Sequence, residues 1–152
     1  MAIGQSRLHE MFRRGRRISD IAAWYGTFES GQVRKEILDW IKEDQLQKGV
    51  DGNNEVIGLY SYATELISNG AKQEGDPYTL YDTGEFYRSM YLVILPDTLV
   101  FEADPMKGKD NLFTKLDSGS SIIKLNTENR IKLTKLVKQR YIEYIKEILL
   151  RP

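Results

Sequence analysis

The chain has 152 residues, enough for one domain with a hydrophobic core and too few for two domains of ordinary size. Its 22 basic side chains balance its 22 acidic ones, so any attraction to nucleic acid must come from local clusters of charge. The absence of cysteine excludes disulfides, thiolate metal sites and cysteine nucleophiles. No segment approaches the roughly 18 apolar residues of a membrane helix, and the first residues lack the apolar core of a leader. We therefore expect a soluble protein made in the cytoplasm, with no membrane partner.

Residues 1–28 combine arginines with apolar side chains, and they predict a basic, partly helical N-terminal arm ahead of a single α+β domain over residues 29–152. Three interpretations stay open: a solvated basic segment without a specific task, a clamp on a neighbouring subunit, or a surface that faces DNA phosphates. The apolar residues exceed what so short a piece can bury alone, which favours docking. The residues proposed for this arm are Arg7, Arg13, Arg14, Arg16, Arg17, Met11, Phe12, Trp24 and Tyr25.

Between the arm and residue 80 the sequence predicts one helix and a less regular stretch. Apolar residues from Val33 to Ile41 lie on one helical face over residues 30–47, and Gly49 is placed to end that helix. Residues 50–58 are expected to form a loop or a short extended piece. Residues 59–67 fit a strand or a short helix equally well. Glycines and a proline then predict an extended flap over residues 68–79.

Residues 80–90 predict a short helix that leads into a strand. Asp82 is placed to cap the helix, and Glu85 can reach back to complete a capping box, so we expect the helix to begin near Thr83. Residues 91–95 are β-branched or aromatic, as is typical of a strand. The motif of this helix-to-strand elbow consists of Asp82, Thr83, Gly84, Glu85, Phe86 and Ser89.

The second half of the chain predicts a hairpin and a long helix. Residues 91–95 and 99–103 have strand composition and are joined by Pro96-Asp97-Thr98. Residues 104–109 and 117–121 are expected to be polar loops, and a last helix, capped by Asn126 or Thr127, should extend to about Leu150. One hairpin is too small to be stable alone, so a strand near residue 60 or 122, or the long helices, must cover it. The fold class is therefore α+β: a small hairpin-centred sheet packed with a central helix and a long C-terminal helix.

The sequence offers weak support for chemistry. Residues 51–55 place oxygen ligands at alternate positions, as a calcium loop does, but the later glycine and glutamate of such a loop are missing, which favours a polar turn. His9 is the only histidine. Asp82 and Glu85 could act as paired carboxylates, although capping already accounts for their spacing. The aromatic residues between Tyr78 and Tyr91 suit a core or a protein interface better than a stacking platform for bases. We predict no catalytic residue, no metal site and no cofactor.

The elbow also carries a family resemblance. Asp82-Thr83-Gly84, followed by Ser89 and then strands, resembles the pattern of the tail-completion and virion-morphogenesis proteins of tailed bacteriophages. Residues 122–130, which open the last helix, resemble a second segment of that family and lie in the same order. Residues 45–51 and 80–84 are especially similar to versions from phages of Bacteroides-type hosts, including crAss-like phages.

The resemblance implies a structural subunit of the virion neck or upper tail, assembled in the host cytoplasm. Such a subunit would form a ring with copies of itself, join portal or adaptor proteins to tail proteins, surround the DNA passage and perform no enzymatic chemistry. Two alternatives of other classes remain. The chain could be a small phage DNA-binding or DNA-modulating protein that uses the N-terminal arginines, or a small hydrolase of unknown type.

Overall fold

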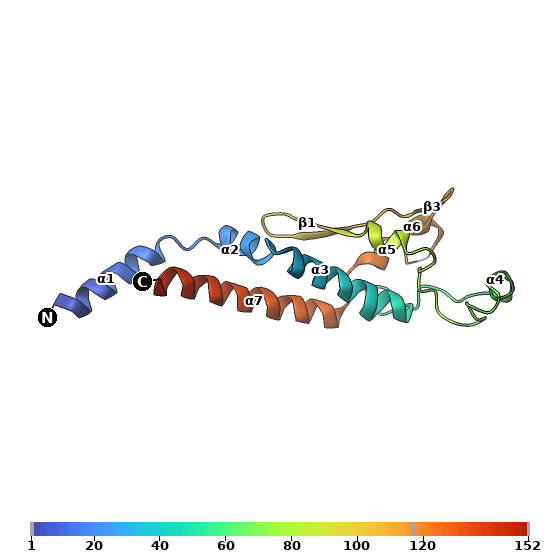
Figure 1. Cartoon of the computed structure of the whole chain (residues 1–152), viewed down its shortest axis with the longest axis horizontal. Coiled ribbons are helices and arrows are strands. Elements are labelled where there is room, and N and C mark those ends of the chain that lie inside the picture. Colours follow the sequence, from blue (N-terminus) through green and yellow to red (C-terminus); the bar gives the residue numbers. More distant parts are fainter. Residues whose placement is uncertain (1, 117, 152) are drawn as a thin grey trace.

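The C-terminal helix is the longest element among the described residues, and we call it the spine of the molecule. The computed structural model describes residues 2–116 and 118–151, and α7 (Thr127–Leu150) extends over 24 of them. At 1.5 Å per residue this helix is about 36 Å long. Asn126 caps it, because its side chain accepts a hydrogen bond from the backbone N–H of Asn129. The predicted helix and its cap are therefore confirmed. The molecule is elongated along this spine (Figure 1).

Two helices of the N-terminal arm continue this elongated shape. They are α1 (Ala2–Gly15) and α2 (Asp20–Thr27), and both contact α7. Ser19 caps α2, and the Tyr144 hydroxyl of α7 accepts a hydrogen bond from its backbone N–H at 3.3 Å. The Tyr141 hydroxyl donates to Asp20 at 2.5 Å. The arm is thus largely helical, and part of its apolar surface, including Ala23 and Phe28, is buried within the same chain.

The predicted helix over residues 30–47 exists but changes its geometry along its length. It begins as α3 (Gly31–Asp39), continues as a π-helix over Trp40–Gln45 and finishes as a 3₁₀ turn over Leu46–Lys48. The wider π turn accompanies a fully buried Gln45, whose polar amide a regular amphipathic pattern does not anticipate. Gly49 ends the helix with a φ of 71°, as predicted.

The stretch between this helix and the elbow folds back on itself. Residues 62–67 form α4 (Tyr62–Ile67), capped by Ser61, so the helical alternative for this region is the observed one. Residues 68–79 contain no helix or strand and return beside residues 58–60. The backbone N–H of Tyr78 donates to Gly58 at 2.7 Å, and that of Tyr60 donates to Asp76 at 2.9 Å. In Figure 1 this segment lies at the end of the molecule opposite to the N-terminus.

The helix-to-strand order of the elbow and the main hairpin form as predicted. Helix α5 (Glu85–Ser89) leads into β1 (Tyr91–Ile94), which pairs antiparallel with β2 (Leu99–Glu102), Val93 standing opposite Val100. The polar loop expected over residues 104–109 is instead part of a second small hairpin, β3 (Met106–Lys107) with β4 (Asp110–Asn111). Gly108 has a φ of 62° and permits its tight turn.

Short helices replace the second expected loop. Asn111 caps α6 (Leu112–Lys115), and a 3₁₀ helix covers Gly119–Ile123. Residues 118–121 are therefore partly helical, while Asp117 lies outside the described residues. The reason is burial: Ile122 is completely buried and Ile123 is 8% exposed, so this segment packs against the core instead of extending into solvent.

Two apolar clusters hold these elements together. One centres on Phe28, Val33 and Ile37, which are covered by residues of the β1–β2 hairpin and of α7. The other joins the π-helix, α5 and the 3₁₀ helix that precedes α7, and its central residues are Ile41, Leu46, Ile57, Phe86, Tyr87, Met90, Ile122, Ile123 and Leu125. Leu133 of α7 packs against both clusters. The fold is α+β, and helices rather than a third strand cover the main hairpin. Among the described residues, no helix combines the length and apolarity needed to cross a bilayer.

Candidate functional site

The elbow motif differs from its predicted capping arrangement. Helix α5 begins at Glu85 instead of near Thr83, and Gly84 occupies the N-cap position with a φ of 81° and no side-chain cap. Asp82 does not cap the helix, because its carboxylate pairs with Lys107 at 2.9 Å and Lys72 at 3.5 Å. The capping box predicted for Asp82 and Glu85 is therefore wrong: a left-handed glycine starts the helix, and two lysines from outside the motif attract the aspartate.

The remaining motif residues make a structural joint between α5 and the hairpin. The Ser89 hydroxyl donates to the Phe86 carbonyl at 2.7 Å and accepts the backbone N–H of Asp104 at 3.0 Å. It thus links the end of α5 to Asp104, two residues after the end of β2. Phe86 is buried in the core, while Thr83 accepts a hydrogen bond from Arg88 through its carbonyl. Serine and glycine here serve backbone geometry rather than chemistry.

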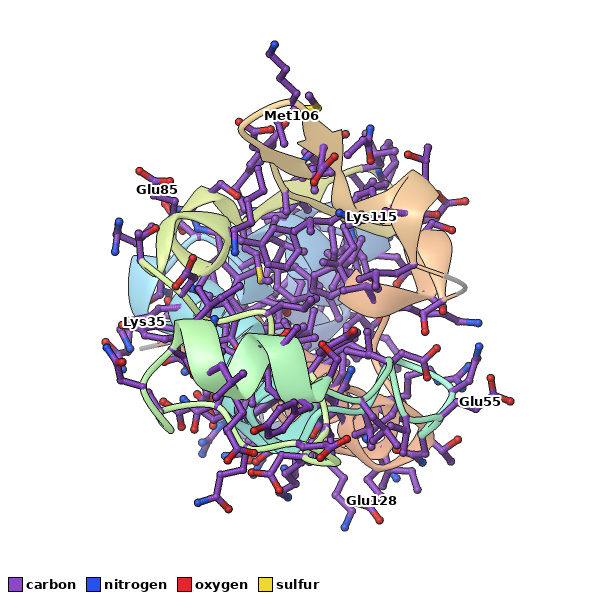
Figure 2. The ribbon with its side chains drawn as sticks, turned by 90° about the vertical axis from the view of Figure 1, so that its right-hand side faces the viewer. Lys35, Glu55, Glu85, Met106, Lys115 and Glu128 are labelled. Atoms are coloured by element: carbon purple, nitrogen blue, oxygen red, sulfur yellow. The ribbon has the colours of Figure 1, made fainter. Side chains whose placement is uncertain are left out.

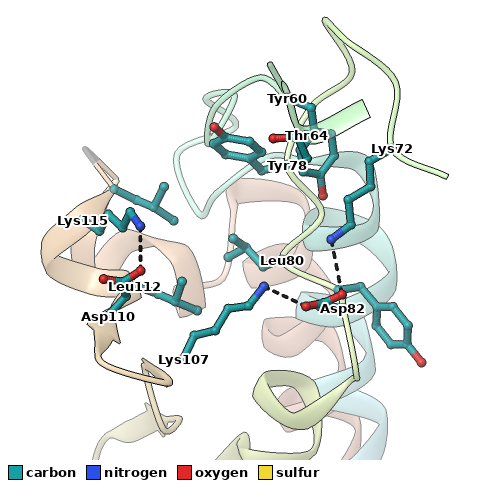
Figure 3. A pocket seen from close by; sticks show the side chains of 12 residues that line it. Tyr60, Thr64, Lys72, Tyr78, Leu80, Asp82, Lys107, Asp110, Leu112 and Lys115 are labelled. Atoms are coloured by element: carbon teal, nitrogen blue, oxygen red, sulfur yellow. Dashed lines mark hydrogen bonds and ion pairs between the residues drawn. The ribbon is translucent and has the colours of Figure 1, made fainter. Parts of the chain in front are cut away.

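Beside the motif lies a pocket of about 330 Å³ between residues 60–82 and residues 107–116. Its charged side chains are largely neutralised in pairs: Lys107 and Lys72 hold Asp82, and Lys115 pairs with Asp110 at 2.7 Å (Figure 3). Lys107 above all, and then Lys72, lower the pKa of Asp82. Asp82 is therefore a poor proton acceptor near neutral pH, which disfavours the paired-carboxylate alternative. Within the described residues, no group of three or more potential metal-ligating side chains comes together.

A buried polar cluster fixes the start of α7, and sequence reasoning missed it. The Gln45 amide donates to the Lys124 carbonyl at 2.8 Å and accepts the backbone N–H of Asn126 at 2.9 Å. Asn129 donates to Gln45 at 2.9 Å and to the Trp40 carbonyl at 3.2 Å. Because buried polar groups need such partners, this cluster specifies how the π-helix and α7 meet.

The predicted calcium-like loop is a polar turn. The Asp51 carboxylate accepts the backbone N–H groups of Asn53 at 2.8 Å and Glu55 at 3.0 Å, and the Ser121 hydroxyl at 2.7 Å. Burial raises the pKa of this carboxyl, but these hydrogen bonds outweigh it and lower the pKa of Asp51 overall. Asp51 therefore ties the loop to the segment that precedes α7.

The arginines of the arm do not all face solvent in the same way. Arg7, Arg13, Arg16 and Arg17 are exposed, whereas Arg14 is partly buried. Arg14 donates to Glu10 at 2.8 Å and also to the backbone carbonyl of Arg151, next to the end of α7. Arg14 thus holds α1 against α7, and Arg13 also pairs with Glu10, at 3.5 Å.

The apolar residues of the arm separate into two groups. Trp24 is half-buried, stacks edge-on against Phe28 and donates through its indole N–H to Leu95 at 2.6 Å, so it helps to attach α2 to the hairpin. Leu8 and Phe12 remain 55% and 67% exposed, and Tyr25 is exposed as well. A shallow groove of about 520 Å³ lies here, lined by Leu8, Met11, Phe12, Gly15, Arg16, Ile18 and Leu149.

The aromatic residues around the elbow mostly belong to the interior. Phe86 and Tyr87 are buried, and Tyr87 packs edge-on against Tyr81 with a centroid distance of 5.3 Å. The Tyr87 hydroxyl donates to the Thr79 carbonyl at 2.5 Å, and burial raises the pKa of this phenol. Tyr91 is exposed on β1. The arrangement is that of a core with single exposed rings and not a row of stacking surfaces.

Comparison with known proteins finds no matching family model, no matching curated protein and no matching solved structure.

Proposed function

We propose that this chain is a structural subunit of the neck or upper tail of a tailed-phage virion, where it forms a homo-oligomeric ring between portal or adaptor and tail proteins. The observation that carries the proposal is the elbow. Its glycine and serine occupy positions where a left-handed φ and a hydroxyl bridge are needed to join α5 to the hairpin. The order of this motif and the last helix along the chain resembles that of virion-morphogenesis proteins.

The surface also suits assembly. The β1–β2 hairpin is two-stranded within the described residues, so the outer edges of both strands have backbone groups available for pairing. The groove on the arm exposes apolar side chains next to arginines. Exposed apolar surface with a charged rim is typical of protein interfaces.

The test is to count the chain in purified virions of the phage that encodes it, by quantitative mass spectrometry relative to the portal and major tail proteins. We expect a fixed copy number at a small multiple, about six or twelve, because a ring closed by rotation requires a constant number of subunits. Absence from virions that contain normal amounts of portal protein would refute the proposal.

The DNA-binding alternative rests on the exposed arginines of α1 and the following turn. Arg7, Arg16 and Arg17 are exposed and have no ion pair in the described part of the chain. If this were the main function, the isolated chain would bind random-sequence duplex DNA with a steep dependence on salt, and replacing these arginines with alanine would abolish binding. In the neck proposal the same residues contact a neighbouring subunit, and isolated chains bind DNA weakly.

A further inference from the structure

Helix α4 exposes its apolar side and turns polar side chains inward, the reverse of an ordinary surface helix. Its polar residues Thr64 and Glu65 are half-buried, and Glu65 accepts the backbone N–H of Glu74 at 2.8 Å. The apolar residues occupy the outer face: Tyr62 is 57% exposed, Leu66 is 59% exposed and Ile67 is 84% exposed. A surface helix normally buries its apolar stripe, so this outward face is an interaction surface.

The surroundings of α4 are acidic. We call residues 59–76 the tip, since they lie at the end of the molecule opposite to the N-terminus (Figure 1). The tip carries Glu65, Glu74 and Asp76 against a single lysine, Lys72, which gives a formal net charge of minus two. Figure 2 views the molecule from this end, with the short green helix α4 towards the viewer. The tip therefore presents an apolar helix face with an acidic border.

The opposite end of the molecule has the complementary character. The groove on the arm is lined by apolar residues of α1, of the following turn and of the end of α7. Residues 7–17 carry five arginines against one glutamate, a formal net charge of plus four. Leu8 and Phe12 lie one helical turn apart and remain largely exposed on the same face. This end therefore presents an apolar groove with a basic border.

We infer that the apolar face of α4 in one copy of the chain docks into the arm groove of a second copy, with the acidic border of the tip against the arginines. Two features support this occupant. An amphipathic helix in an apolar groove is a recurrent mode of recognition, with anchors three and four residues apart; Tyr62 and Leu66 are four apart, and so are the exposed Ala63 and Ile67. The opposite charges of the two ends also favour this orientation over a tip-to-tip or arm-to-arm contact.

The contact is heterologous, because it joins two different patches that lie at opposite ends of an elongated molecule. Repetition of such a contact gives a closed ring or a filament, and the smallest closed ring is an antiparallel pair in which each tip meets the arm of the other copy. The inference rests on the proposed function for its biological setting, since it names the surfaces through which the subunits of the ring would meet. The open edges of the β1–β2 hairpin stay available for other partners.

The experiment uses two full-length double variants, each with one damaged surface. The tip variant carries Leu66→Asp and Ile67→Asp, and the arm variant carries Leu8→Asp and Phe12→Asp. All four side chains are more than half exposed, so both variants should keep the circular dichroism spectrum of the parent chain. Masses are measured by sedimentation velocity over protein concentrations up to about 1 mM, which detects even weak association.

We expect the parent chain to self-associate into a closed ring of two or more copies or a filament, and each variant alone to remain monomeric. A one-to-one mixture of the two variants should form a dimer and nothing larger, because each variant retains one intact surface. This recovery also demonstrates that both variants are folded. Ile131→Asp, at a side chain of α7 that is 51% exposed, serves as the matched control and should assemble like the parent.

Other outcomes would overturn the inference. A tip variant that still assembles like the parent would place the contact elsewhere, and a mixture that stays monomeric would contradict pairing between tip and arm. A parent chain that remains monomeric at every concentration would do the same. These failures differ from failure of the proposed function, because the count of the chain in virions does not depend on which surfaces subunits use.

Discussion

Gly52 provides the sharpest test of how the loop of residues 51–55 meets the start of α7. Gly52 is buried, and its backbone N–H donates to Ser121 at 2.9 Å. A Cβ atom at this position would lie 2.3 Å from the Lys124 carbonyl oxygen and 2.7 Å from the Lys124 carbonyl carbon. Because these atoms belong to the backbone, no rotamer change can relieve the clash. Gly52→Ala must therefore displace residue 124.

The cost has two parts. Overpacking a well-filled interior typically costs about 1–3 kcal/mol. Displacing the Lys124 carbonyl also removes a hydrogen-bond partner from the buried amide of Gln45, which costs about 1–3 kcal/mol more. We therefore expect Gly52→Ala to lower the free energy of unfolding by about 3 kcal/mol, or the melting temperature by roughly 6–12 °C for a chain of this size.

Thermal unfolding followed by circular dichroism, at a dilute protein concentration, measures this effect. Gly31→Ala is the matched control, because no atom lies within 4 Å of the added Cβ and the residue is helical, so stability should be unchanged or slightly higher. A melting temperature of Gly52→Ala within about 2 °C of the parent would mean a cost below about 1 kcal/mol. The close approach of Gly52 to Lys124 would then be wrong.

Four further predictions concern other contacts. Asn129→Ala removes a buried donor to two carbonyl oxygens, so it should lower the free energy of unfolding by about 2–3 kcal/mol in urea denaturation, and a loss below about 0.5 kcal/mol would contradict the buried polar cluster. The lowered pKa of Asp51 stabilises the folded state above the ordinary aspartate value of 3.8, so the stability of the parent should fall as the pH drops below that value. Asp51→Asn should lack this part of the pH dependence in acid titrations followed by fluorescence. Asp82→Ala should cost less than about 1 kcal/mol and lose even that effect at high salt, because Asp82 and its closer partner Lys107 are more than half exposed. A larger, salt-independent loss would indicate a capping role after all. Deletion of residues 1–17 should leave a folded, helical monomer by circular dichroism and sedimentation, and loss of folding would contradict the view that α1 serves assembly.

Regular, amphipathic or β-branched segments were predictable from the sequence. Some features depend on interactions between residues that are close in the sequence, and such interactions can be recognised without the fold. They are the cap at Asn126, the apolar stripe of α7 and the turn at Pro96–Thr98. The helix-to-strand elbow was predictable for the same reason, although its first residue was not.

Tertiary contacts decided the features that the sequence did not reveal. Asp82 fits a cap until Lys107, 25 positions later, competes for its carboxylate, and no local pattern signals that encounter. The π turn that accompanies Gln45 depends on partners about 80 positions away. The apolar face of α4 was visible as a pattern, but periodicity cannot tell which side of a helix faces the interior. An inside-out helix of this kind can be found only from the fold.

The attachment of α7 to the N-terminal half has a consequence for how the chain acquires its structure. The hydrogen bonds that join Ser19 to Tyr144 and Asp20 to Tyr141 span more than 120 positions, and Leu133 packs against both apolar clusters. During synthesis, therefore, the cluster around Phe28, Val33 and Ile37 cannot be fully covered until α7 has left the ribosome. Until then the N-terminal helices expose the apolar surface that α7 covers, and contacts so distant in sequence form slowly. A nascent chain therefore lacks part of its stabilising contacts until α7 is available.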